Sequence, residues 1–244
     1  MTHANGVPSP YRGESMCGRL VLHSQPEHLA RFLNATLIAG MEPRLAPTWN
    51  LTPQQDLLAV SQIEGQGRVM NSFRWGLLPA WAVDTSFTAN TINARAETVR
   101  EKPSFRDAFA QRPCIIPVDG FYEWDRRDGH GKRAHYFFRS DGQPMLLAGL
   151  YEHWVQPGHD SRTTCTIVTS AANENMAELH DRMPVIVEEQ DVTTWLTAPA
   201  SDRYDLLRPP LAKILDQHGV SDAVGNIRNN GPALVAPAER STLF

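Results

Sequence analysis

The sequence predicts an α+β fold, with a single mixed domain built around a largely antiparallel β-sheet. Its apolar segments are short and numerous, and turn residues separate them. They do not alternate regularly with helical patterns, as the strands of a doubly wound parallel sheet would. Of the 244 residues 41% are hydrophobic, enough for one sizeable core. No internal repeat or linker divides the chain after residue 15.

The first element expected is a helix near residues 25–35. The stretch Ser24-Gln25-Pro26-Glu27 has the pattern of a capping box with proline in the first turn. Leu29, Phe32 and Leu33 then recur at helical spacing. Further helices are expected at 174–180, 188–196 and 202–217.

Most of the remaining elements are expected to be strands. Residues 56–60 and 68–75 flank a Gly65-Gln66-Gly67 turn, whereas the prolines between 40 and 55 predict an irregular crossing. Asp128-Gly129 and Asp141-Gly142 have the composition of tight turns. Further strands are expected at 114–118, 134–139, 144–151, 163–169 and 184–187.

The two ends of the chain differ in composition from the middle. Residues 1–15 hold prolines, glycines and small polar residues without an apolar run, so we expect a disordered extension that is absent from the mature protein. The domain is expected over 16–236 and a loose tail over 237–244. The extension lacks the apolar stretch of a secretory signal, and no segment resembles a membrane span, so we expect a soluble, cytoplasmic protein.

The charge and the cysteines restrict the kind of function. The formal net charge is −4, which disfavours a protein that coats nucleic acid, so binding to a polyanion would depend on a local patch. Cys17, Cys114 and Cys165 cannot all pair within one chain, and their spacing does not match a zinc site. We therefore expect no metal and no cofactor.

Cys17 stands directly after Met16, at the point where the polar extension ends. A cysteine in such a place is commonly a small core residue. If the working protein begins at Met16 and loses it, however, Cys17 becomes the first residue. It then carries a thiol and a free amine on adjacent carbons.

Three further polar residues lie where a strand or its end should be apolar. Asn93 precedes Arg95, and the pair could orient a nucleophile and grip phosphate, or serve as a turn residue and a solvated ion-pair partner. Glu123 lies among aromatic residues, where strand alternation would bury it beside Phe121, unless it is a strand-edge residue in water. His180 follows a short predicted helix, which it could simply end. Other histidines have no comparable setting: His23, His28, His130, His135, His153 and His159.

Several short motifs occur in order along the chain and together resemble the SRAP family, the SOS-response-associated peptidases that crosslink to abasic sites in DNA. The resemblance covers nearly all of residues 16–236. The motifs are Met16-Cys17-Gly18-Arg19-Leu20, Trp49-Asn50-Leu51-Thr52-Pro53, Arg74-Trp75-Gly76-Leu77-Leu78-Pro79-Ala80-Trp81, Ile92-Asn93-Ala94-Arg95-Ala96-Glu97-Thr98, Asp119-Gly120-Phe121-Tyr122-Glu123-Trp124, His180-Asp181-Arg182-Met183-Pro184 and Val224-Gly225-Asn226.

The resemblance implies a barrel-like β core with peripheral helices, and a site that traps abasic single-stranded DNA as a thiazolidine on an N-terminal cysteine. It also implies self-processing that exposes this cysteine, and reversal of the crosslink. The implied catalytic residues are Cys17, Asn93, Glu123 and His180. The implied DNA-binding residues are Arg19, Asn50, Trp81, Arg95 and Arg182. Trp81, with Leu77 and Leu78, is expected either to wedge against bases or to pack in the core.

An abasic deoxyribose opens to an aldehyde, which an unprotonated α-amine attacks and a neighbouring thiol then closes into a ring. We expect a monomer that acts at the nucleoid, with replication-fork proteins as further partners. Two other function classes stay open. A cysteine peptidase acting on other proteins would not need the terminal amine, and a non-covalent single-strand DNA-binding module would not need the aldehyde.

Overall fold

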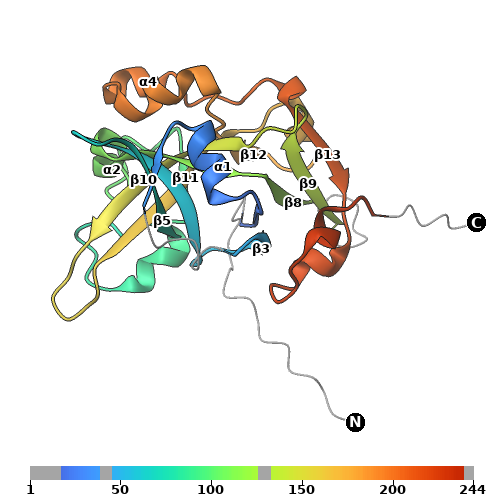
Figure 1. The fold of residues 1–244 in the computed structure, drawn as a ribbon, viewed down its shortest axis with the longest axis horizontal. Helices are drawn as coiled ribbons and strands as arrows, with labels where there is room; N and C mark the ends of the chain where they lie inside the picture. Colours follow the sequence, from blue (N-terminus) through green and yellow to red (C-terminus); the bar gives the residue numbers. More distant parts are fainter. Residues whose placement is uncertain (1–17, 39–45, 126–132, 239–244) are drawn as a thin grey trace, which may run out of the picture.

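The computed structural model describes residues 18–38, 46–125 and 133–238. Two sheets form the body of the molecule, and short helices lie around them (Figure 1). None of the helices in these ranges is long and apolar enough to cross a membrane. The predicted mixed α+β class is confirmed.

The larger sheet is ring-like. Its path ends at β2 (Thr36–Leu37) and β12 (Arg182–Pro184). Thr164 and Cys165 pair in parallel with Arg74 and Trp75, which joins two strands that are distant along that path. All other pairs in the ring are antiparallel, so the expected barrel-like, largely antiparallel core is present. The ring strands are, in spatial order, β11 (Arg162–Ala171), β10 (Met145–Trp154), β7 (Pro113–Val118), β4 (Asp56–Ile63) and β5 (Gly67–Trp75).

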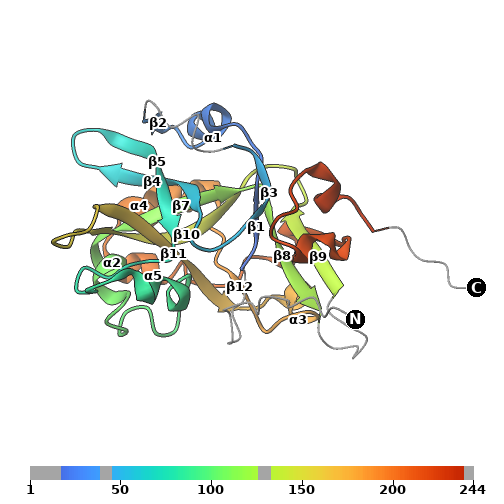
Figure 2. The same cartoon turned by 90° about the horizontal axis from the view of Figure 1, so that it is seen from below.

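The smaller sheet is antiparallel throughout and carries β1 and β8 side by side (Figure 2). The chain passes from the larger sheet to the smaller one between β7 and β8, which are separated by the single residue Asp119. Asp119 also accepts hydrogen bonds from the backbone N–H groups of His23 (2.6 Å) and Ser24 (2.9 Å), which fixes the end of β1 against this corner. The strand order is β13 (Leu215–Gly219), β9 (Arg133–Arg139), β8 (Gly120–Asp125), β1 (Leu20–Leu22) and β3 (Thr48–Leu51).

The helices are short and peripheral. The α-helices are α1 (Pro26–Phe32), α2 (Arg106–Gln111), α3 (Glu174–Ala177), α4 (Val192–Thr197) and α5 (Ala200–Tyr204). The 3₁₀ helices are η2 (Thr85–Asn90), η3 (Glu189–Asp191), η4 (Ala212–Ile214), η5 (Asp222–Gly225) and η6 (Pro232–Val235). Their buried side chains cover apolar sheet faces; Trp195 of α4, for example, donates to the Cys114 carbonyl of β7 at 2.8 Å.

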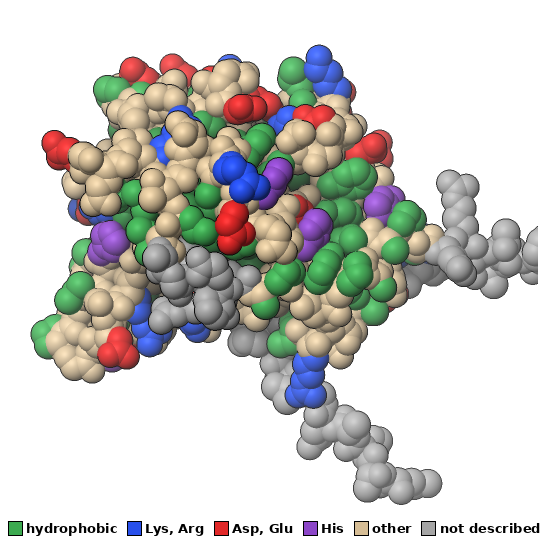
Figure 3. Space-filling view, in the orientation of Figure 1, with side chains coloured by type: hydrophobic (Ala, Val, Ile, Leu, Met, Phe, Trp, Pro, Cys, Tyr) green, Lys and Arg blue, Asp and Glu red, His purple; other side chains and the backbone are tan. Residues whose placement is uncertain are grey.

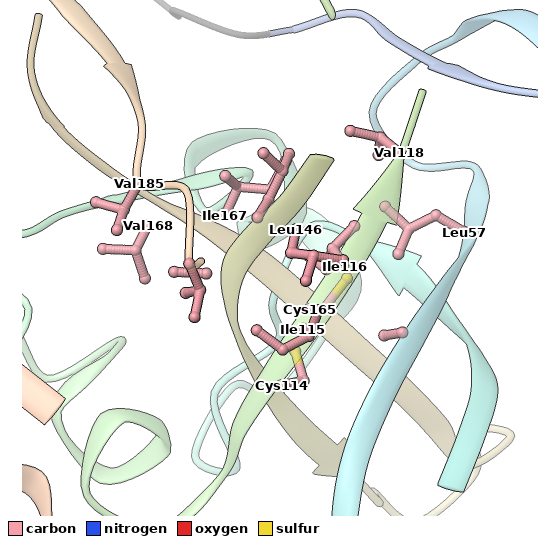
Figure 4. Packing of buried hydrophobic residues seen from close by; sticks show 14 of the residues in the cluster. Leu57, Cys114, Ile115, Ile116, Val118, Leu146, Cys165, Ile167, Val168 and Val185 are labelled. Atoms are coloured by element: carbon pink, nitrogen blue, oxygen red, sulfur yellow. The ribbon is translucent and has the colours of Figure 1, made fainter. Parts of the chain in front are cut away.

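The interior of the ring is close-packed. Leu57, Ile116, Ile167 and both described cysteines lie in it, and none is accessible to solvent (Figure 4). Gly149 faces Cys114 across the β10–β7 pair, where an added Cβ would come within 2.8 Å of the Cys114 Sγ. Glycine is required here because the core leaves no room for a side chain.

Most of the predicted elements are confirmed within a few residues, and the β4–β5 hairpin has positive φ at Gly65 and Gly67, as its turn composition requires. The capping box is wrong: Gln25 is the N-cap without a side-chain hydrogen bond, and the Ser24 hydroxyl donates to Asp119 instead. The expected turn at Asp128-Gly129 lies outside the described residues.

Three predicted segments differ from the structure. The helix expected at 202–217 is wrong: α5 ends at Tyr204, Pro209 and Pro210 lack the N–H groups that a helix needs, and a strand begins at Leu215. The proline-rich crossing contains β3. The strand expected at 184–187 begins two residues earlier, at Arg182, and continues past Pro184 only as an isolated bridge between Ile186 and Leu147.

Gly120 offers a test of the corner between the two sheets. An added Cβ would lie 2.3 Å from the Phe137 carbonyl oxygen and 2.5 Å from the Tyr136 ring. We expect Gly120→Ala to lower the free energy of unfolding by about 1–3 kcal/mol through overpacking. Gly219→Ala, where nothing lies within 4 Å of the added Cβ, is the matched control and should change it by less than about 0.5 kcal/mol. Equal denaturation midpoints for the two variants would contradict this packing.

Candidate active site

The end of β11 brings together two of the polar segments. On one side it pairs with β6 (Asn93–Arg95), and on the other with β12. Thr169 pairs with Arg95 in the first and with Pro184 in the second. Asn93 is half-buried at the start of β6, and Arg95 is exposed at its end. One strand end therefore holds the Asn93 and His180 segments in a common frame.

Arg182 and Glu97 clamp this frame. The Arg182 guanidinium donates from Nη1 to Glu97 Oε1 and from Nη2 to Oε2, both at 3.0 Å, and from Nη2 to the Thr169 carbonyl at 2.7 Å. Burial favours the protonated form of Glu97, but the hydrogen bonds and charge of Arg182 outweigh it and lower the pKa of this carboxyl. Arg182, which the resemblance assigned to DNA, is engaged within the protein.

His180 lies on the loop between α3 and β12, with 16% of its side chain exposed. Its Nδ1 is 3.1 Å from the Arg182 N–H and 2.9 Å from Asp181 Oδ1. The first contact needs a lone pair on Nδ1 and the second needs a hydrogen there, so the two contacts belong to different forms of the ring, such as its two neutral tautomers. The His180 backbone N–H donates to Met176 (2.9 Å), and Asn173 caps α3. The His180 imidazole is thus held where its Nδ1 has a partner both as an acceptor and as a donor.

Glu123 is buried in β8, with 3% of its surface exposed. It shares a sheet face with Phe121, whose ring stacks on Phe137 with centroids 5.1 Å apart. The Trp124 N–H donates to Glu123 Oε1 at 3.2 Å. The alternation predicted from sequence is confirmed, and the alternative of a strand-edge glutamate in water is wrong.

The chain enters the smaller sheet beside this carboxyl. Leu20 lies opposite Phe121 in the β1–β8 pair, and the Tyr122 N–H donates to the Arg19 carbonyl at 3.0 Å, which continues the pairing. One further residue in the same register brings Gly18 level with Glu123. Cys17, the predicted nucleophile, lies outside the described residues.

Asn50 and Arg19 hold the loop at 224–229 against β3. Only 4% of Asn50 is exposed, and its Nδ2 donates to the carbonyls of Val224 (3.3 Å), Asn226 (3.1 Å) and Asn229 (2.8 Å). Arg19 Nη1 lies 2.6 Å from both Asn50 Oδ1 and the Val224 carbonyl. This arrangement gives Asn50, another residue that the resemblance assigned to DNA, a role in positioning Arg19.

Trp81 is 48% exposed, so the alternative of core packing is wrong for this side chain. Its ring meets Phe87 edge-on, with centroids 4.9 Å apart, and its Nε1 lies 3.3 Å from the Pro103 carbonyl. Leu77 and Leu78 are 0% and 1% exposed, which excludes them from a wedge against bases. In the orientation of Figure 3, Lys and Arg side chains are scattered and form no broad basic field on the visible face.

The two described cysteines, Cys114 and Cys165, are unsuited to nucleophilic chemistry. Both are free and fully buried in the ring. Burial raises the pKa of the Cys114 thiol, with a smaller contribution from Cys165, and burial likewise raises the pKa of Cys165. In the described ranges no group of three or more His, Cys, Asp or Glu side chains gathers as a metal site would.

One histidine with no distinctive sequence setting lies beside Glu123 in the structure. His135 on β9 lies directly opposite Glu123. The alternating apolar pattern of 134–139 predicts the strand, but its partner depends on pairing that no local pattern specifies.

The Glu97–Arg182 pair should stabilise the protein in a pH-dependent way. We expect Glu97→Gln to lower the free energy of unfolding at pH 7 by about 0.5–1 kcal/mol, since Glu97 is 53% exposed and solvent screens the pair. Because the folded-state pKa lies below the ordinary value of 4.5, this stabilisation is full above that value and is lost as the pH falls through the folded-state pKa.

Urea denaturation of both proteins across pH 3–7 would measure this difference, with Glu101→Gln as the control for an exposed carboxylate. If the two proteins differ in free energy of unfolding by the same amount at pH 3 as at pH 7, the charge of Glu97 does not stabilise the fold.

The buried thiols make a second prediction. In the native protein at pH 8 we expect Cys114 and Cys165 to resist alkylation, because both thiols stay protonated and inaccessible; in denaturant both should react. Peptide mass mapping after timed iodoacetamide treatment gives the rates. Native-state alkylation of either cysteine at the rate of an exposed thiol would contradict the buried ring.

Known proteins resemble this chain in sequence and in fold. The family profile described as "SOS response associated peptidase (SRAP)" matches residues 16–227. The chain is 37% identical over 223 residues to "Abasic site processing protein YoqW" of Bacillus subtilis (strain 168), covering 90% of this chain and 99% of that protein. It is 29% identical over 272 residues to "Abasic site processing protein HMCES" of Mus musculus, covering 92% and 76%.

Crystal structures share the fold. A protein from Bacteroides thetaiotaomicron superposes with a TM-score of 0.83 at 22% identity, covering 91% of this chain and 100% of that one. A Bordetella bronchiseptica protein gives 0.72 at 27% identity, covering 84% and 100%. With the family match spanning most of its length, the chain belongs to the SOS response associated peptidase (SRAP) family.

Proposed function

We propose that this chain processes abasic sites in single-stranded DNA by forming a covalent thiazolidine between Cys17 and the opened deoxyribose. The observation that carries the proposal is the pairing of β1 with β8, which the Tyr122–Arg19 backbone hydrogen bond extends to within one residue of the buried Glu123 and of Gly18. Cys17 is bonded to Gly18, with consecutive Cα atoms about 3.8 Å apart. The names of the relatives YoqW and HMCES support the same substrate.

The chemistry uses both nucleophiles of an N-terminal cysteine. The α-amine, with an ordinary pKa of about 7.7–8.0, attacks the aldehyde carbon as a free base and gives a carbinolamine. Protonation of its hydroxyl releases water and leaves a Schiff base. The thiol sulfur then adds to the imine carbon while its proton passes to the nitrogen, which closes a five-membered ring. The net change is the loss of one water.

Three side chains serve these proton transfers. Glu123 exchanges protons with the amine and the leaving hydroxyl, since a buried carboxyl is readily held in its acid form. His180 acts on the sugar hydroxyl during ring opening, and its Nδ1 has a partner both as an acceptor and as a donor. Asn93, at the start of β6, orients the cysteine.

The amine of Cys17 must be free for this reaction. The proposal therefore includes a mature chain that begins at Cys17, either because translation starts at Met16 or because the peptide bond between the two residues is hydrolysed with one water. The family match begins at residue 16, and the family is described as peptidases, which supports either route.

Binding to DNA relies on a few local contacts, because a chain of net charge −4 gains little from non-specific attraction. Arg95 is exposed and makes no hydrogen bond or ion pair with another described side chain, so it is placed to contact phosphate. The exposed Trp81 ring offers a stacking surface that tolerates any base. Asn50 and Arg182 contribute indirectly by holding Arg19 and the β6–β12 frame.

Replacement of the cysteine is the direct test. We expect Cys17→Ala to abolish the adduct with an abasic single-stranded oligonucleotide on a denaturing gel, and Cys17→Ser to form it far more slowly because a hydroxyl is the poorer nucleophile. Cys165→Ala is the control, because it removes a buried thiol and should keep the adduct at full yield. An undiminished adduct from Cys17→Ala would refute the proposal.

Acetylation of the terminal amine separates the three function classes. A crosslinking protein should lose the adduct. A peptidase acting on other proteins should keep its activity, and a non-covalent binding module should give a complex that dissociates in denaturant with or without acetylation.

A further inference from the structure

The carboxyl of Glu123 has an ionisable neighbour on β9. In the antiparallel β8–β9 register Glu123 lies opposite His135, so the two side chains project from the same face with Cβ atoms about 4.5–5.5 Å apart. The preceding pair on that face is Phe121 and Phe137, whose rings are stacked with an interplanar angle of 7°. This stacking shows that side chains on the face meet across the two strands.

The imidazole of His135 is tethered on its other side. Its Nδ1 lies 2.7 Å from Oε1 of Gln217 on β13. Because an amide oxygen can only accept, Nδ1 carries the hydrogen in this contact. The ring orientation and tautomer are thereby set, and Nε2 is left as the nitrogen that gains or loses a proton.

Glycines flank this pair of side chains in the sheet. Gly219 lies opposite His135 on β13, and Gly18 comes level with Glu123 on the side of β1. An added Cβ would meet nothing within 4 Å at either glycine. The space beside Gly219 and the space beside Gly18 can therefore each admit another group, and Cys17 is bonded to Gly18.

The charged surroundings of Glu123 are few among the described residues. The strands packed beside it present only uncharged Gln217 and Gly219 from β13 and Gly18 from the β1 side. Arg139, farther along the same face, is paired with Asp141 and Glu188. The titratable or charged groups beside Glu123 on this face of β8 and β9 are His135, Arg133 and Asp125, with Arg133 opposite Asp125, and the proposed function adds His180 and the Cys17 amine.

We infer that His135, held by Gln217, is a positioning residue for Glu123, which it orients and whose protonation it controls. This inference rests on the proposed function of Glu123. A protonated imidazole beside the carboxyl favours the carboxylate, and a neutral imidazole allows the acid. The charge of the imidazole therefore alters how readily Glu123 gives or accepts protons.

The test is the rate of adduct formation with an abasic single-stranded oligonucleotide, measured from pH 5 to 9. We expect His135→Phe to slow it at least about tenfold, in the range for a lost proton-transfer contribution, and to shift its pH profile. His153→Phe is the matched control: His153 is also a strand histidine, with Nδ1 2.9 Å from a cross-strand Thr163 hydroxyl, but on β10. It should leave rate and profile unchanged.

A double-mutant cycle separates this inference from the proposed function. If His135 acts through Glu123, Glu123→Gln with His135→Phe should be no slower than Glu123→Gln alone. The inference is wrong if the double variant is slowed by the product of the two single-variant factors. It is also wrong if His135→Phe keeps the wild-type rate and pH profile. A wild-type rate for Glu123→Gln overturns the role proposed for Glu123 itself.

Gln217→Leu provides a second variant that keeps the imidazole and removes only its tether. We expect a smaller loss of rate and a shifted pH profile. If His135→Phe fails to fold, a wild-type rate and profile for Gln217→Leu contradict the inference.

Discussion

The antiparallel pairing of β1 with β8 is the constraint on which the site depends. It brings the first described residues to the strand that carries Glu123, and the Tyr122–Arg19 backbone hydrogen bond continues the pairing beyond β1. A slip of one residue between β1 and β8 would shift Arg19 away from Tyr122 and turn the β1 side chains to the opposite face of the sheet. The Asp119 corner opposes such a slip, because its carboxylate binds the backbone at the end of β1.

The second part of the site is assembled by the larger sheet. The end of β11 is shared between β6 and β12, and the Arg182–Glu97 clamp joins the segments beyond those strands. Arg182 and Asn50, which the resemblance assigned to DNA, make hydrogen bonds within the protein. The buried Asn50 amide donates to three carbonyls and has little donor capacity left.

Local sequence patterns were a good guide where local physics decides the structure. The α1 helix, the β4–β5 hairpin with its glycine turn and the burial of Glu123 by alternation all followed from short-range patterns. The helix predicted at 202–217 is absent because Pro209 and Pro210 lack the N–H groups that would continue it. The closure of the ring through Thr164 and Cys165, and the pairing of His135 with Glu123, depend on contacts distant in sequence. The candidate residues themselves came from ordered motifs, and only the structure distinguished the buried Asn50 from the exposed Trp81.

The central claim is that a free amine and a thiol on one residue close a ring on the abasic sugar. Intact mass spectrometry of the protein purified from cells, before and after incubation with an abasic oligonucleotide, tests it most directly. The account predicts a polypeptide that begins at Cys17 and a product whose mass equals protein plus oligonucleotide less one water. A polypeptide that keeps the residues before Cys17 and still forms the product in full yield would contradict it.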